Sequence, residues 1–120
     1  MDSELIDADE LEDLGDYRVA VRGVPVTGRV AVRDAEGRTV AIMTYDGGIQ
    51  AGLTRTFHPN GQPRSERWYE GGVPKGIGRD WYDNGQLRSK AYYDLGQVLD
   101  ERTWAEDGTQ LSGPAEPDEG

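Results

Sequence analysis

The sequence predicts an all-β protein, an elongated and twisted antiparallel meander in which tandem β-hairpin repeats of about 24 residues form a single layer. Glycine and aromatic residues recur in phase at this period, which is typical of arrays built from one supersecondary unit. The series are Gly28, Gly52, Gly76; Gly37, Gly61, Gly85; and Tyr45, Tyr69, Tyr93. A hydrophobic content of only 35% also favours a thin sheet that is stabilised by contacts between neighbouring repeats.

The N-terminal segment, residues 1–16, holds eight acidic residues and no Lys or Arg. Ser3 can cap a short helix that Gly15 ends, and the apolar positions of this helix are Leu5, Ala8, Leu11 and Leu14. We therefore expect a short N-terminal helix that covers the edge of the first strand.

The repeat domain is expected to span residues 17–111, with its first strand, from Tyr17, matching the second half of a repeat. The hairpin tips are expected at residues 34–37, 58–61, 82–85 and 105–108, because each ends in a glycine that suits the left-handed position after a type I turn. About nine strands follow. The clearest are residues 53–57, 64–69, 77–81 and 88–93, and the Gly-rich joints between hairpins return the chain.

Strand pairing follows from these turns. If Gly61 is the bulge residue, Phe57 faces Pro63, Arg55 faces Ser65 and Leu53 faces Arg67. One face then gathers most of the aromatic residues, and its candidate partner-binding residues are Arg55, Phe57, Tyr69, Arg79, Trp81, Tyr93, Arg102 and Trp104. The opposite face is mostly polar and includes Lys90, with Trp68, Tyr82 and Tyr92 as exceptions.

The arginines of this stripe, Arg55, Arg79 and Arg102, occupy the same repeat position, two residues before an aromatic residue. One interpretation is structural: each guanidinium lies over a neighbouring ring or pairs with an acid, which contributes about 0.5–1 kcal/mol when exposed. The other is functional, because arginine and aromatic side chains are enriched at protein–protein hot spots. Both interpretations can hold together.

The charge of the chain, −10 overall, is concentrated at its ends. Residues 105–120 hold five further acids and no basic residue, which leaves 10 of the 23 acids against all 13 bases in the repeat body, a net charge of about +3. A nucleic-acid mimic would carry its acidic charge on the folded body, so this class is disfavoured. Residues 112–120, with two prolines, are expected to form a disordered acidic tail.

The sequence contains few of the residues that catalysis usually needs. The chain has no cysteine, which excludes disulfides and thiolate metal sites, and its one histidine, His58, stands at a hairpin tip, where a solvent-facing turn residue is expected. The glycines of residues 71–78 superficially suggest a phosphate-binding loop but lack the strand–loop–helix order that such loops need. We therefore expect no catalytic residue, no metal and no cofactor.

The repeat resembles the MORN repeat variant that occurs in tandem in small bacterial proteins, many of them labelled antitoxins. The matching pattern is an aromatic residue, Asn-Gly at the tip, an aromatic pair and a glycine, here Trp81-Tyr-Asp-Asn84-Gly85 followed by Tyr92-Tyr93-Asp-Leu-Gly96. A second match is Phe57-His-Pro-Asn60-Gly61 followed by Trp68-Tyr69-Glu-Gly71. The resemblance covers about residues 28–111 and implies an elongated sheet with a binding role.

Two classes of function remain. The first is a non-enzymatic protein-binding module, an antitoxin or immunity protein that neutralises a toxin through its aromatic and arginine face or its acidic ends. The alternative is a structural or membrane-associated scaffold, although the acidic ends disfavour anionic lipid. We expect a protein partner, no nucleic acid, no membrane association, and strand edges that allow an edge-to-edge homodimer. The absence of cysteine and of a secretion signal leads us to expect a cytoplasmic protein.

Overall fold

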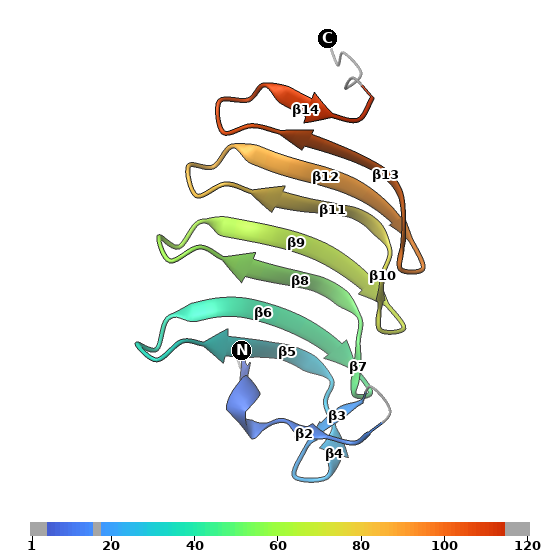
Figure 1. Cartoon of the computed structure of the whole chain (residues 1–120). Helices are drawn as coiled ribbons and strands as arrows, with labels where there is room; N and C mark the ends of the chain where they lie inside the picture. Colours follow the sequence, from blue (N-terminus) through green and yellow to red (C-terminus); the bar gives the residue numbers. More distant parts are fainter. Residues whose placement is uncertain (1–4, 16–17, 115–120) are drawn as a thin grey trace.

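The computed structural model describes residues 5–15 and 18–114, and these form an extended sheet of antiparallel hairpins with principal dimensions of 49 × 33 × 26 Å (Figure 1). The all-β, elongated architecture expected from the glycine periodicity is confirmed. The expectations for Ser3, Tyr17 and residues 115–120 lie outside the described residues.

Within the described residues, 11 strands form one sheet and three form a second, smaller sheet. The smaller sheet contains β2 (Glu12–Asp13), β3 (Val19–Val21) and β4 (Val24–Pro25). The long strands of the main sheet are β5 (Gly28–Arg33), β6 (Thr39–Asp46), β8 (Gly52–Phe57), β9 (Pro63–Glu70), β11 (Gly76–Trp81), β12 (Leu87–Asp94) and β13 (Gln97–Trp104). The short strands of the main sheet are β1 (Ile6–Asp7), β7 (Ile49–Gln50), β10 (Val73–Pro74) and β14 (Gln110–Ser112).

The four hairpin tips lie where the sequence predicts them, along one side of the sheet, and the joints lie along the other side (Figure 1). Each tip closes with a hydrogen bond from the glycine N–H to the carbonyl three residues earlier, as from Gly61 to His58 at 2.8 Å. Gly61 has φ +87° and Gly85 has φ +89°, values that an L side chain rarely adopts.

Hydrogen bonds at both sides of the sheet connect each hairpin to the next. At the tips, the Asn60 side chain donates to the Asp83 carbonyl at 2.9 Å, and Asn84 repeats the contact with Glu106 at 3.3 Å. At the joints, a glycine N–H donates to a carbonyl of the preceding joint. The donor–acceptor pairs are Gly48–Val26, Gly72–Gln50 and Gly96–Pro74, at 2.8, 3.0 and 2.9 Å.

The strand register differs from the predicted one by a single residue. Phe57 pairs with Pro63 as expected, but the register then shifts, so Arg55 pairs with Glu66 and Leu53 with Trp68. The predicted partners Ser65 and Arg67 were wrong, because the strand after the tip contains one extra residue at its start. A slip of one residue moves side chains to the opposite face, so the predicted single aromatic face divides between the two faces of the sheet.

The prediction of an N-terminal helix was also wrong. Ile6 and Asp7 instead pair parallel with Val30 and Ala31, and only Ala8–Glu10 form a short 3-10 turn, whose cap is the Asp7 carboxylate. The segment does cover the edge of the first hairpin. The largest group of fully buried residues lies at this end of the molecule and comprises Ala20, Val26, Val30 and Ala31.

Candidate protein-binding surface

The three arginines singled out by the repeat lie in one row across the sheet. Register pairs Arg55 with Glu66, Glu66 with Arg79, Arg79 with Lys90 and Lys90 with Arg102. We call these five residues the cationic row. Because directly opposite residues share a face of a sheet, the predicted grouping of Arg55, Arg79 and Arg102 holds, and Lys90 joins them rather than lying on the opposite face.

Ion pairs neutralise the two ends of the cationic row. The Arg55 Nε donates to Glu66 Oε2 at 3.0 Å, and the Arg102 Nη1 lies 3.2 Å from Asp100 Oδ2. Arg79, at the centre, forms no ion pair with any residue in the described part of the chain. Its guanidinium is therefore available to a ligand or partner.

An apolar row runs beside the cationic row, two residues further from the tips, and consists of Leu53, Trp68, Ile77 and Tyr92. Leu53 is opposite Trp68, Ile77 is opposite Tyr92, and the register that pairs Glu66 with Arg79 places Trp68 beside Ile77. Trp68 is 52% exposed, Tyr92 50% and Ile77 37%. Sequence reasoning treated Trp68 and Tyr92 as exceptions on a polar face, although the charge match of Arg55 with Glu66 could have revealed the true register.

Tyr69 and Tyr93 lie on the opposite face, apart from the three arginines, because each is three residues from a member of the cationic row on the same strand. There Tyr93 contacts Arg67, whose guanidinium carbon is 5.6 Å from the ring centroid. Gly78 lies between the two, because a Cβ at this position would be 2.9 Å from Arg67 Cδ and 3.0 Å from Tyr93 Cε1.

The Arg67 side chain is the centre of a polar network on this face. Its Nη2 donates to Asp80 Oδ2 at 3.1 Å, and the Ser89 hydroxyl donates to the same oxygen at 2.7 Å. Burial disfavours the charged guanidinium, but the hydrogen bond and charge of Asp80 outweigh it and raise the pKa of Arg67 above its usual value. This network connects β9, β11 and β12 and serves stability.

The aromatic residues at the tips, Phe57, Trp81 and Trp104, are the last residues of their strands, at the positions where the register shifts. Trp104 is only 8% exposed, so it belongs to the core. The carbonyls of Trp81 and Trp104 each accept a hydrogen bond from a side chain of the preceding hairpin. His58 Nε2 lies 2.8 Å from the Trp81 oxygen, and the Tyr82 hydroxyl donates to the Trp104 oxygen at 2.8 Å.

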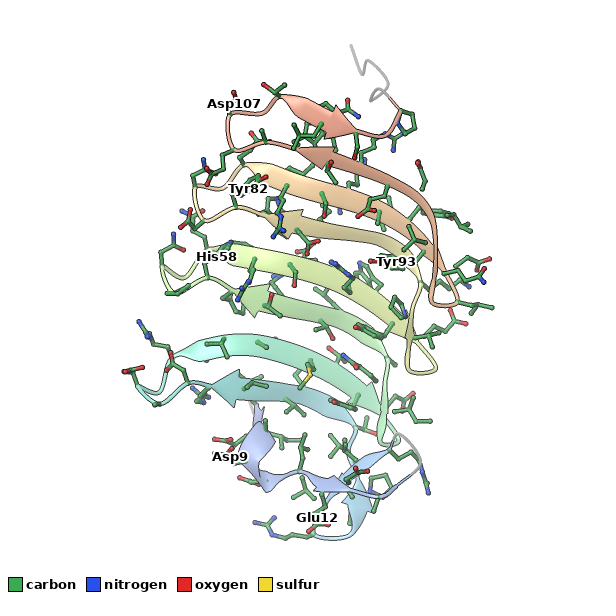
Figure 2. All side chains as sticks on the ribbon, viewed as in Figure 1. Asp9, Glu12, His58, Tyr82, Tyr93 and Asp107 are labelled. Atoms are coloured by element: carbon green, nitrogen blue, oxygen red, sulfur yellow. The ribbon has the colours of Figure 1, made fainter. Side chains whose placement is uncertain are left out.

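His58 and Tyr82 thus hold equivalent places one repeat apart, at the tip side of the sheet, whereas Tyr93 lies toward the joints (Figure 2). The His58 ring is engaged with backbone rather than facing solvent as the sequence suggested. A groove of about 680 Å³ runs along these tips, and its lining includes Thr56, His58, Arg64, Ser65, Asp80, Tyr82 and Arg88. The groove offers hydroxyls and guanidinium groups for hydrogen bonding.

Residues 5–15 and 18–114 lack two features that mark other functional classes. No group of three or more His, Asp or Glu side chains in these ranges could hold a metal ion. No helix there has the length and apolar character needed to span a membrane.

Comparison with known families places MORN repeat variant units at residues 50–70 and 74–95. These ranges contain the two central hairpins, β8–β9 and β11–β12, which carry Trp68, Arg79 and Tyr92. MORN repeats are generally protein-binding and non-catalytic modules. No curated protein matched the chain.

Proposed function

We propose that this chain binds a partner protein through the face that carries the apolar row and the cationic row, and that the partner is a toxin which the chain neutralises in the cytoplasm. The observation that supports the binding face is the exposure of Trp68 and Tyr92 beside Arg79. About half of the surface of each of these two residues is exposed.

Trp, Tyr and Arg are the residue types most enriched at the energetic centres of protein–protein interfaces. Here all three types occur within the two central hairpins. Trp68 and Tyr92 provide large rigid surfaces, Ile77 fills the space between their strands, and Arg79 provides a fork of donors without an internal ion pair to break. Binding at this place therefore needs little rearrangement of the sheet.

The charge of this face indicates the chemistry of the partner. The cationic row contains four basic residues and one acid, Glu66, and Asp100 adds a second acid beside Arg102, so a net charge of about +2 remains. A partner surface with an apolar centre and carboxylates at its rim would complement it, because complementary charges increase the association rate and exclude other partners.

The toxin-neutralising role is the more specific part of the proposal. It rests on the resemblance of the repeat to the repeats of small bacterial proteins that are labelled antitoxins. A structural scaffold differs from it in a measurable way: the chain would bind without changing its partner's activity. Co-expression with the protein encoded by the neighbouring gene tests this part. Rescue of growth from that protein's toxicity supports neutralisation, and binding without rescue favours the scaffold.

The binding face is tested by calorimetry with the same partner. Trp68→Ala and Arg79→Ala should each weaken binding by roughly thirtyfold, since truncation of a hot-spot residue typically costs about 2 kcal/mol. Val24→Ala is the matched control, because Val24 is 65% exposed but lies on β4 in the smaller sheet. Circular dichroism verifies folding of each variant. Unchanged affinity for both face variants, with loss on removal of residues 1–15, would assign binding to the acidic N-terminal segment instead.

A further inference from the structure

The two edges of the main sheet are not equivalent. At the N-terminal edge, β1 pairs along β5 through Ile6 and Asp7. At the C-terminal edge, β14 pairs with β13 only at Thr103 and Trp104. After β14 the chain passes Glu101 and Arg102, where the Arg102 Nε donates to the Pro114 carbonyl at 2.8 Å. Among the described residues, no strand lies against the outer side of 97–100, although Gln97, Val98 and Asp100 pair with β12 on the inner side.

The last unit also ends the series of hydrogen bonds in which each joint accepts from the glycine N–H of the next joint. The acceptors of this series are the carbonyls of Val26, Gln50 and Pro74, each 24 residues after the previous one. The next residue in the series is Val98, and no further joint follows it in the described chain. The carbonyl of Pro74 points to the next unit, and Pro74 has no N–H. Val98 holds the same repeat position, so its N–H and carbonyl point away from β12.

Apolar side chains gather at the same corner. Leu95 is 62% exposed, Leu99 57% and Val98 52%. Leu95 also has φ +49°, a left-handed conformation, at the place where the earlier joints have Gly47 and Gly71. A large apolar side chain thus replaces glycine at a position that disfavours it and faces solvent. Retained backbone strain of this kind often marks a functional contact.

We propose that two copies of this chain pair antiparallel through the outer edge of β13, about a two-fold axis, with Leu95, Val98 and Leu99 covering the contact. A two-fold axis brings the same edge of both copies together, and such an interface must be self-complementary. The edge meets this condition in a register centred on Val98, in which Val98 of one copy is opposite Val98 of the other and no two charges of the same sign are opposite each other.

A second copy fits residues 97–100 better than the chain's own residues after Pro114. The sequence after Pro114 contains Glu116, Pro117, Asp118 and Glu119. A proline cannot donate to a strand ladder, and these acids would repel Asp100 and Glu101. The contact also differs from the proposed partner face, because the apolar and cationic rows of each copy stay exposed on the joined sheet.

Sedimentation of the full chain over a wide concentration range tests the proposal, and a monomer–dimer equilibrium is expected. Val98→Pro should weaken the dimer roughly thirtyfold, since the symmetric interface loses one backbone donor from each copy at about tenfold or less per bond. Pro74 at the same repeat position shows that the fold accepts proline there. Val98→Thr, which keeps both the N–H and the β-branched shape, is the control and should remain dimeric.

Several outcomes would overturn the proposal. A wild-type chain that stays monomeric at every concentration would do so, as would a dimer that survives Val98→Pro. A dimer lost in Trp68→Ala but retained in Val98→Pro would place the contact on the sheet face. If deletion of residues 115–120 is required before a dimer forms, the tail and not a second copy occupies the edge.

Discussion

Replacing Gly78 by alanine tests the packing of the face opposite the cationic row. Gly78 is buried on β11 and its backbone lies outside the left-handed region, so the substitution adds one methyl group without backbone strain. That methyl would meet Arg67 Cδ at 2.9 Å and Tyr93 Cε1 at 3.0 Å. Both neighbours must move, and with them the contact of the guanidinium with the Tyr93 ring and with Asp80.

The magnitude follows from two opposing effects. Insertion of a methyl group into a packed site costs about 1–3 kcal/mol. Alanine in place of glycine recovers about 0.5–1 kcal/mol by reducing the freedom of the unfolded chain. The free energy of unfolding should therefore fall by about 1 kcal/mol, which lowers the melting temperature of a domain of this size by roughly 4 °C or more.

Thermal and urea unfolding of Gly78→Ala, Arg67→Ala and the double variant measure this effect. In the Arg67→Ala background the closest obstacle is absent and the Tyr93 ring can move into the vacated space. The same glycine replacement should then be nearly neutral, with a coupling energy of about 1 kcal/mol between the two sites. Equal effects of Gly78→Ala in both backgrounds would refute the packing of Arg67 and Tyr93 over Gly78.

Three further predictions concern the tips. Tyr82→Phe should lower the free energy of unfolding by about 1 kcal/mol in urea titrations, because the Trp104 carbonyl loses its donor; an unchanged midpoint would contradict that bond. Gly61→Val should cost about 1–2 kcal/mol, measured by thermal melting, because φ is +87°. The hydrogen bonds from Arg38 and Glu36 lower the pKa of Asp34, and those from Thr109 lower the pKa of Asp107. The stabilisation from these two carboxylates is present above the unfolded pKa of about 3.9 and is lost as pH falls through the folded pKa values. Asp34→Asn should therefore flatten the acid side of a plot of melting temperature against pH.

The repeat period was sufficient to predict the fold class and every hairpin tip. Glycines such as Gly61 and Gly85 fix the chain reversals through their positive φ, and this requirement is local and can therefore be predicted from the sequence.

The last unit shows why the period of the repeat changes near its end. It is one residue shorter, Leu99 occupies the place of Gly76, and β13 runs without a break from Gln97 to Trp104.

The candidate site was only partly predictable because register depends on side-chain pairs between strands. The three arginines kept their common row, since equivalent repeat positions share a face. Their relation to Tyr69 and Tyr93 depended on one bulge near each tip, which the turn motif alone does not specify. Pairs nine residues apart, such as Thr56 with Ser65 at 2.6 Å, fix the actual register.

The N-terminal segment illustrates a different limit. The spacing of Leu5, Ala8 and Leu11 fits a helical stripe, but the open edge of β5 offers backbone partners to an extended chain. A short isolated helix is marginal because nucleation is costly. Pairing with an existing strand satisfies the backbone groups of Ile6 and Asp7 at less cost, and periodicity cannot report this competition.

The contacts at tips and joints, in which each hairpin holds only the next, have a mechanical consequence. A load applied across the array, from the first hairpin to the last, is carried in series by links such as Asn60 with Asp83 and Gly72 with Gln50. The weakest link then sets the rupture force, whatever the number of units. Extension should proceed as a staircase of hairpin-sized steps, and the sheet would yield by peeling while the remaining units keep their shape.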